Sequence, residues 1–297
     1  MKFLNKFRQS SKLSKDIDFI YNSIDNLKPI SIQYISLIAP IKKNILNFRD
    51  KNKNIIIEKK NKKMSLIVPY RHRKEHLDKF LPYINSYLKK QNIEYEIIVV
   101  EQLDNKSFNK AKLMNIGALN SSKDSDYFVF HDVDLLPENI DYNYTNHTQK
   151  LFTYIKENNE YKKYGEMIFG GAILIPINIF FDINGFSNQY WQWGKEDDDF
   201  FMRNLIKGYV PLINTEGKFI ALPHEPSLNR ASDGSYVKNK VILKENKKLY
   251  QSNRKYFSNF KRGFINQNND GYSTLKNYKI KSIIEQNFVK TIAVEFV

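Results

Sequence analysis

The sequence contains no cysteine among its 297 residues, which excludes a disulfide framework and any metal site built from thiolates. A bound metal ion would therefore need oxygen and imidazole ligands. The longest apolar run, ISLIAPI at residues 35–41, is far shorter than the roughly 20 residues that a membrane-spanning helix needs. The basic start MKFLNKFRQSSK is not followed by the apolar core of a signal peptide. We therefore expect a cytoplasmic protein without a transmembrane helix.

The glycine-rich phosphate-binding motifs are also absent. Neither G-x-G-x-x-G nor G-x-x-x-x-G-K-[ST] occurs. Because these loops let the backbone approach a pyrophosphate closely, their absence argues against dinucleotide and P-loop chemistry.

Acidic residues are fewer than basic ones, with 32 Asp and Glu against 47 Lys and Arg and a formal charge of +15. Residues 1–63 hold 15 of the basic residues and 5 of the acidic ones, so the excess is concentrated there. We interpret residues 1–63 as a basic accessory segment with a linker, and residues 64–297 as the main domain. The segment could be a solvated arm, a peripheral contact with an anionic membrane at its inner face, or a nucleic-acid binder. The nearly balanced main domain speaks against nucleic acid as a partner.

Short apolar runs alternate with helical patterns from Met64 onward. The runs at 64–70, 95–100 and 127–134 are typical of buried strands, and residues 73–90 and 108–119 have helical character. Strand, helix, strand, helix and strand in this order predict an α/β fold with a Rossmann-like, mostly parallel central sheet flanked by helices. Sites in such sheets lie beyond the carboxyl ends of the strands.

Two carboxylates, Asp132 and Asp134, stand at the end of the third predicted strand. Alternate residues of a strand face the same way, so both side chains can point at one spot. Hard oxygen donors suit Mg²⁺ or Mn²⁺ with a bound diphosphate. The segment PYRHR at 69–73 leaves the first strand at the same edge and offers guanidinium groups for phosphate. Together they indicate a nucleotide-sugar site, although a D-x-D pair alone can be an acidic turn.

Several motifs in a fixed order give the sequence a specific resemblance. Residues 64–297 resemble the β-1,4-galactosyltransferase family (glycosyltransferase family 7), including its N-acetylgalactosaminyl and xylose-directed branches, and the resemblance implies the GT-A fold. The matching blocks are VPYRHRKEHL (68–77), FNKAKLMNIG (108–117), HDVDLLP (131–137), FGGAILI (169–175), NGFSNQYWQWGKEDDDF (184–200), ALPHEP (221–226) and NNDGYSTLKNY (268–278).

The resemblance implies a donor site built from several of these blocks. Its expected residues are Pro69, Tyr70, Arg71, Arg73, Phe108, Asn109, Lys110, Asp132, Val133, Ile168, Gly170, Gly171 and Trp193. Lys110 replaces an arginine of the family, which keeps the charge but loses bidentate geometry. Ile168 stands where galactose-using members have tyrosine. The smaller side chain leaves room for an acetamido group and favours UDP-GalNAc over UDP-Gal as donor.

The resemblance also implies a metal site. Asp134 and His224 match the family's metal ligands, and Mn²⁺ is the expected ion. Ala221 stands where many members have a methionine ligand, so water would fill that position. Without the soft ligand, Mg²⁺ becomes an alternative.

The four adjacent carboxylates at 196–199 cannot share one task if a helix begins near Glu196, because successive residues turn by roughly 100°. Negative charge is favoured at a helix start. Asp199 lies four residues before Arg203, so we expect the two to pair, with Phe201 and Leu205 facing the core. These three expectations rest on helix geometry alone.

The resemblance divides the rest of the cluster. It implies that Asp197 is the catalytic base and that Trp193, Gly194, Glu196 and Asp198 line the acceptor site. The implied reaction is metal-dependent inverting transfer of Gal or GalNAc from a UDP-sugar to a sugar hydroxyl, forming a β linkage, expected to be 1,4, in a surface glycan. The rival interpretations are a non-catalytic nucleotide-sugar or carbohydrate-binding protein and, on net charge alone, a nucleic-acid binder.

Overall fold

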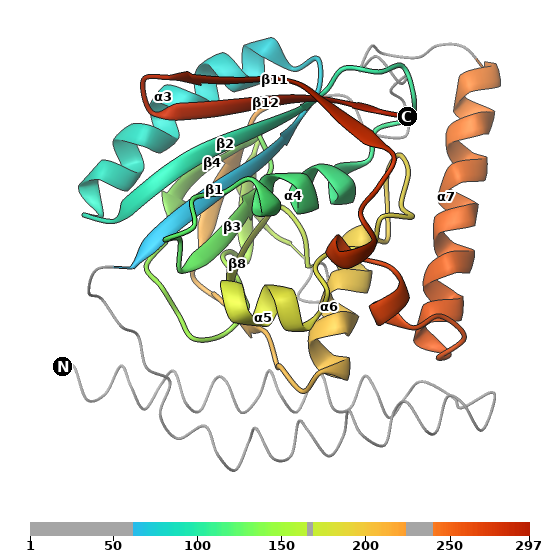
Figure 1. Ribbon diagram of the computed structural model, residues 1–297. Helices are drawn as coiled ribbons and strands as arrows, with labels where there is room; N and C mark the ends of the chain where they lie inside the picture. Colours follow the sequence, from blue (N-terminus) through green and yellow to red (C-terminus); the bar gives the residue numbers. More distant parts are fainter. Residues whose placement is uncertain (1–61, 165–168, 224–239) are drawn as a thin grey trace.

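The computed structural model describes residues 62–164, 169–223 and 240–297, which form two sheets with helices packed around them (Figure 1). The larger sheet has the strand order β11-β12-β2-β1-β3-β8-β5-β9, and the smaller one β4-β10-β6-β7. The larger sheet contains β1 (Lys63–Tyr70), β2 (Glu94–Gln102), β3 (Tyr127–His131), β5 (Gln149–Lys150), β8 (Ala172–Pro176), β9 (Leu212–Ile213), β11 (Tyr278–Gln286) and β12 (Val289–Phe296). The smaller sheet contains β4 (Leu135–Asn139), β6 (Tyr154–Glu157), β7 (Glu160–Lys163) and β10 (Lys218–Ala221). The helices are α3 (Lys74–Lys90), α4 (Lys110–Leu119), α5 (Ile177–Asp182), α6 (Glu196–Ile206) and α7 (Lys240–Lys261), with 3-10 turns η2 (Gln267–Asn269) and η3 (Tyr272–Thr274).

The centre of the larger sheet is the predicted alternation of strands and helices. β1 pairs in parallel with β2 and β3, and α3 and α4 are the two crossovers. β12, from the C-terminal end of the chain, pairs in parallel with β2. β8 runs antiparallel to β3, and β11 antiparallel to β12. The predicted α/β fold is confirmed, with parallel strands at the centre of the sheet and mixed pairing toward its edges.

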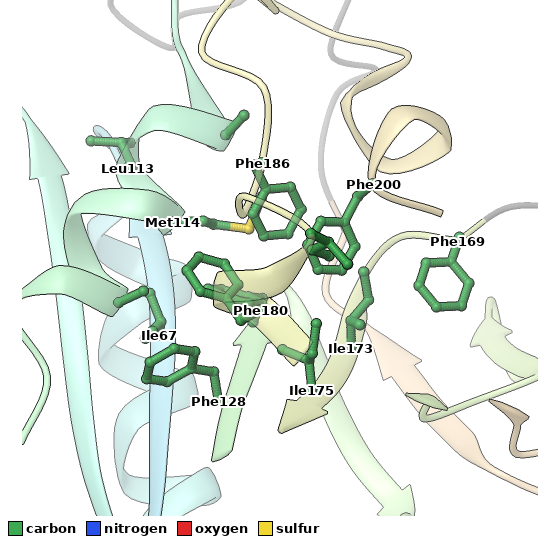
Figure 2. Close-up of a cluster of buried hydrophobic side chains, with 14 of the residues drawn as sticks. Ile67, Leu113, Met114, Phe128, Phe169, Ile173, Ile175, Phe180, Phe186 and Phe200 are labelled. Carbon is green, nitrogen blue, oxygen red and sulfur yellow. The ribbon is translucent and has the colours of Figure 1, made fainter. Parts of the chain in front are cut away.

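Alternate residues of the central strands pack on opposite faces of the sheet. Leu66 and Val68 of β1 belong to the core cluster that contains the buried side of α3, whereas Ile67 belongs to the cluster that contains α4. Figure 2 shows this second cluster, where the rings of Phe186 and Phe200 stack at a centroid distance of 3.9 Å. Burying one such side chain stabilises the fold by ~1.5–3 kcal/mol. Because Phe200 belongs to α6, the core holds the helix that carries the acidic cluster.

Two predicted boundaries are wrong in an informative way. The third strand ends at His131, so Asp132, Val133 and Asp134 form the turn into β4 rather than the end of a strand. The strand-alternation argument for their side chains therefore does not apply. The second helix begins at Lys110 instead of residue 108, because the Asn109 side chain caps it by accepting a hydrogen bond from the Lys112 amide.

The long helix α7 stands at one side of the domain (Figure 1). It contacts the region of α6 through aromatic rings: Tyr256 lies edge-on to Tyr190, and the guanidinium of Arg203 lies over Phe260 at 5.5 Å. Within the three described ranges, no helix is long and apolar enough to cross a membrane.

Candidate active site

The predicted site residues meet where the parallel strands end. β1 ends at Tyr70 and β3 at His131, and the N-termini of α4 and α6 face the same edge, since Lys110 of α4 reaches both Asp132 and Asp197. This is the edge at which open α/β sheets bind ligands.

Lys110 joins the two carboxylates that the resemblance assigns to donor and base. Its Nζ lies 2.9 Å from Oδ1 of Asp132 and 3.5 Å from Oδ2 of Asp197. The side chains are largely buried, with exposed fractions of 16% for Lys110 and 22% for Asp197. The site therefore combines one cation and two carboxylates in a partly desolvated space.

This environment shifts the protonation equilibria of the site. Burial raises the pKa of Asp197 well above its ordinary value, and the nearby Lys110 charge only partly offsets this effect. Burial opposes the charge of Lys110, but the attraction of Asp132, Asp197 and Glu196 prevails and raises the pKa of the lysine. A carboxyl group with a raised pKa beside a permanent cation can accept a proton from a hydroxyl group.

Gly170 leaves space for the Asp197 carboxylate. A Cβ at position 170 would lie 2.9 Å from Cγ of Asp197 and closer still to Oδ2. Gly171 has φ of +87°, a conformation that glycine adopts readily, and its carbonyl accepts the amide of Asp132 at 2.8 Å. The two glycines thus bring the chain just before β8 against the Asp197 carboxylate and the Asp132 backbone.

Asp134 lies beside different partners from Asp132. The guanidinium of Arg73 donates a hydrogen bond to the Asp134 carboxylate. The backbone oxygen of Asp134 accepts a hydrogen bond from the amide of Leu222 at 2.8 Å. β10 runs antiparallel to β4 with Ala221 opposite Leu135, so the chain after Ala221 passes Asp134. His224 lies outside the described residues, two positions beyond Leu222.

A manganese or magnesium ion fits the chemistry of this corner. The Asp134 carboxylate side chain is only 10% exposed and already binds a cationic group, the Arg73 guanidinium. The expected ligands are the Asp134 carboxylate and the imidazole of His224. Both ions accept oxygen and imidazole ligands.

The acidic cluster divides as helix geometry predicts. α6 begins at Glu196, and the buried Glu196 side chain accepts the Gly194 amide at 3.1 Å. Asp198 pairs with Lys195 at 2.6 Å. Asp199 is fully buried and pairs with Arg203, which confirms that expectation.

The core positions expected in α6 are also confirmed, since Phe201 and Leu205 are buried. Lys195 itself adopts φ of +80° at the N-cap and lies over the ring of Phe257 from α7. It therefore links the cluster to that helix.

The two tryptophans have different environments. Trp191 packs against the core and lies edge-on to Phe296. Trp193 is 46% exposed and stacks on Tyr250 of α7 at a centroid distance of 5.3 Å. Trp193 is thus the more exposed of the two rings, and its contact with an acceptor sugar stays a prediction.

Several predicted donor residues make contacts within the protein. The Arg71 guanidinium donates to the carbonyls of Asp104 and Lys106 and lies 5.9 Å from the ring of Phe108. Asn109 is buried. Its side-chain oxygen caps α4, and its side-chain nitrogen donates to the carbonyl of Asn188 at 3.1 Å. Their contact with a nucleotide stays a prediction.

The other donor positions lie along the same edge. Pro69 and Tyr70 are buried at the end of β1, and Val133 is buried in the turn. Ile168 lies outside the described residues, as do residues 1–61 of the predicted accessory segment.

Sequence reasoning missed a buried network behind the site. Asp270, within the NNDGYSTLKNY block, accepts from Ser187, from Tyr256 at 2.8 Å and from the amide of Asn188 at 2.9 Å. Its backbone carbonyl accepts from Arg203 at 2.7 Å. The block was visible in the sequence, but Ser187, Asn188 and Arg203 lie 67 to 83 residues away from Asp270. Only the fold therefore reveals that this block supports α6.

Comparisons with known proteins agree with this arrangement. Residues 57–147 match the model for the N-terminal region of glycosyl transferase group 7, and residues 150–224 match the N-terminal domain of galactosyltransferase. The chain is 37% identical over 186 residues to β-1,4-galactosyltransferase 4 of Rattus norvegicus, covering 59% of this chain and 53% of that protein. It is 42% identical over 144 residues to β-1,4-galactosyltransferase 7 of Drosophila melanogaster, covering 48% and 44%. The chain spans about half the length of the curated relatives it matches.

Two solved structures are similar over most of the domain. One is a mutant of Drosophila β-1,4-galactosyltransferase 7 in complex with manganese, UDP-Gal and xylobiose, with a TM-score of 0.62 and 26% identity, covering 80% of this chain and 95% of that one. The other is the catalytic domain of the same enzyme with xylobiose, with a TM-score of 0.61, 30% identity and the same coverage. The chain thus belongs to the group 7 glycosyltransferases, the family of the β-1,4-galactosyltransferases, and has their GT-A fold.

Proposed function

We propose that this protein is a metal-dependent inverting glycosyltransferase that moves galactose from UDP-galactose to a hydroxyl group of an acceptor sugar. The observation that carries the proposal is the pairing of Lys110 with both Asp132 and Asp197 at the carboxyl edge of the sheet. It places a buried carboxylate of raised pKa beside a cation suited to a diphosphate. The similar Drosophila structure with manganese, UDP-Gal and xylobiose supports the same choice of donor and metal.

The donor is held by the basic groups of this edge. Arg73 and Lys110 are both occupied by carboxylates, Asp134 and Asp132 respectively, and can exchange these for phosphate oxygens. Asp134 and His224 would hold Mn²⁺, with Mg²⁺ as the alternative. When bound, the ion supplies charge that stabilises the departing UDP.

Asp197 performs the proton transfer. Its carboxylate takes the proton of the acceptor hydroxyl while that oxygen forms a bond to the anomeric carbon of the donor sugar. The bond from the anomeric carbon to the diphosphate oxygen breaks, and the electron pair leaves with UDP. Attack from the face opposite the leaving group inverts the configuration and yields a β-linked product, for which we propose a 1,4 linkage in a surface glycan.

The exposed side of Trp193 is proposed as the platform for the acceptor sugar. Aromatic faces suit the C–H surfaces of pyranose rings, and this ring lies four residues before Asp197 in the chain. Glu196 and Asp198 are proposed for the same side. Asp198 would first have to leave its contact with Lys195.

A second donor, UDP-GalNAc, is favoured by one feature of the sequence. Ile168 stands where galactose-using members carry tyrosine, and a smaller side chain would accept the acetamido group. If so, Ile168→Tyr raises kcat/KM for UDP-Gal relative to kcat/KM for UDP-GalNAc. An unchanged ratio would remove the reason for this candidate.

We also propose that residues 1–63 form a basic accessory segment and residues 64–297 the catalytic domain. Flotation of the full chain with anionic vesicles, lost on deleting residues 1–61 and weakened by salt, would agree with a peripheral membrane role. Equal flotation of the two chains would contradict it.

The proposal is tested by a donor-by-acceptor screen with Mn²⁺, Mg²⁺ or chelator. We expect UDP release that requires metal and rises when a sugar acceptor is present. Saturable UDP-sugar binding without acceptor-dependent release across the screen would instead favour a non-catalytic binding protein.

A further inference from the structure

The segment that carries Trp193 has a strained backbone. Gln192, Gly194 and Lys195 have φ values of +61°, +106° and +80°. For the two residues other than glycine, the left-handed region is energetically unfavourable. Such a conformation persists only where surrounding contacts hold it. Some of these contacts are local, since the Phe108 carbonyl accepts the Gln192 amide at 2.7 Å and the Glu196 carboxylate accepts the Gly194 amide at 3.1 Å. Others come from α7.

Asn253 of α7 holds the backbone on both sides of Gln192, the first of these residues. Its side-chain nitrogen donates to the carbonyl of Trp191 at 3.0 Å and to that of Trp193 at 3.3 Å. Asn253 is 4% exposed. An amide group has two N–H donors on one nitrogen, so a single buried side chain supplies both bonds.

Tyr250 lies three residues earlier on the same face of α7 and holds the side chain. Its ring stacks on Trp193 with an interplanar angle of 28° and packs against Gly194, where a Cβ would lie 2.8 Å from the tyrosine ring. One side of Trp193 is therefore covered, and the remaining surface leaves it 46% exposed. Tyr250 thus determines which side of the indole is open to a ligand.

We infer that Tyr250 and Asn253 are positioning residues that set the orientation of Trp193 for the acceptor sugar. This inference rests on the proposed function and extends it to α7. The loop leads directly into α6, whose second residue is Asp197, so its conformation also fixes the distance between the aromatic platform and the base. Within the described residues, Tyr250 and Asn253 make no contact with Lys110, Asp132 or Asp134, so the binding of UDP should not depend on them.

The variants Tyr250→Ala and Asn253→Asp test the inference, with Tyr250→Phe as the conservative variant and Ser252→Ala as the matched control. Asp has the size of Asn but no N–H to donate, and Ser252 is exposed on the same helix. We expect Tyr250→Ala to raise the acceptor KM about 3- to 10-fold, the range that loss of one aromatic pair implies. Asn253→Asp should raise it about tenfold or more, because two carbonyls lose their donor. Tyr250→Phe should restore the wild-type value.

Donor affinity separates positioning from general damage. Titration calorimetry with UDP and Mn²⁺ should give the same Kd for all variants, including Asn253→Asp, whose lost hydrogen bonds should lower its thermal unfolding temperature relative to the Ser252→Ala control. An unchanged acceptor KM in both Tyr250→Ala and Asn253→Asp would overturn the inference. So would a parallel loss of donor affinity and stability that explains the change in KM.

A measurement without turnover keeps this inference distinct from the proposed function. Acrylamide quenching of tryptophan fluorescence should increase in Tyr250→Ala relative to Tyr250→Phe, and the increase should vanish when Trp193 is also replaced by Phe. Equal quenching would overturn the inference even in an active enzyme. A wild-type chain without transferase activity would overturn the proposed function, while the quenching result would still show whether Tyr250 orients Trp193.

Discussion

The backbone of Gly170 and the carboxylate of Asp197 are in direct contact, so that any side chain at position 170 would overlap the carboxylate. This contact fixes the place of the proposed base relative to the start of β8.

Gly170→Ala should therefore displace the Asp197 carboxylate. We expect kcat to fall about 100-fold, since a misplacement of the order of 1 Å can cost that much. The affinity for UDP and Mn²⁺, measured by calorimetry, should change little. A variant with wild-type kcat would show that the carboxylate is free to move and that its contact with Gly170 is not needed.

Lys110 should control the pH dependence of the reaction. Its positive charge lowers the pKa of Asp197, which burial raises. Lys110→Met removes the lowering contribution, so the pKa rises further and a smaller fraction of Asp197 is ionised at a given pH. The acid limb of the profile of kcat against pH should move to higher pH. Lys110→Arg keeps the charge and should leave the limb near its original position. A profile unchanged in Lys110→Met would contradict this electrostatic role.

The buried ion pair between Arg203 and Asp199 should matter more to stability than an exposed pair of the same spacing. Both side chains are fully buried, and Arg203 also approaches Asp270 at 3.5 Å. Arg203→Met leaves two acidic groups without their cation and should lower the free energy of unfolding by about 3–5 kcal/mol. Urea denaturation measures this loss.

Lys74→Met is the matched control for that experiment. Lys74 and Asp78 form an exposed pair at the same i,i+4 spacing in α3, and such surface pairs contribute little. Equal effects of the two substitutions would mean that the Arg203 network adds nothing beyond an ordinary surface pair.

Asp134 should be needed for metal-dependent donor binding. Asp134→Ala removes the one described carboxylate assigned to the ion. We expect the affinity for UDP in the presence of Mn²⁺ to fall by more than the roughly 10- to 100-fold that loss of an outer-shell partner costs. In the presence of chelator, the variant and wild type should bind UDP with similar affinity. The exposed Asp141→Asn is the control, and a wild-type response of Asp134→Ala to Mn²⁺ would show that the ion binds elsewhere.

Much of the fold follows from local patterns in the sequence. The apolar runs and helical spacings between residues 64 and 134 predict the three parallel strands and two crossover helices. This works because strands that are buried on both faces of a sheet appear in the sequence as continuous apolar runs. The turn at 132–134 was not predicted. The chain turns there because the next residues, Leu135–Asn139, form β4 and pair with β10, about 80 residues later in the sequence. Long-range pairing of this kind leaves no local signal.

Some parts of the candidate site could be predicted from the sequence and others could not. A helix that starts near Glu196 predicts the Asp199–Arg203 pair from helix geometry alone. The roles proposed for Asp197 and Trp193 come from the resemblance to the family. The link from Lys110 to Asp197 could not be predicted, because it joins two helices through side chains 87 positions apart. The contacts of Tyr250 and Asn253 with the tryptophan loop also depend on where the fold places α7.

The role of Asp197 as the base is tested most directly by Asp197→Asn in the presence of Mn²⁺, the donor and an active acceptor. The amide keeps the size of the side chain but cannot accept the proton of the acceptor hydroxyl. We predict that kcat falls by about 10²–10⁴-fold, while UDP and Mn²⁺ bind with wild-type affinity. Turnover near the wild-type rate would show that Asp197 is not the base.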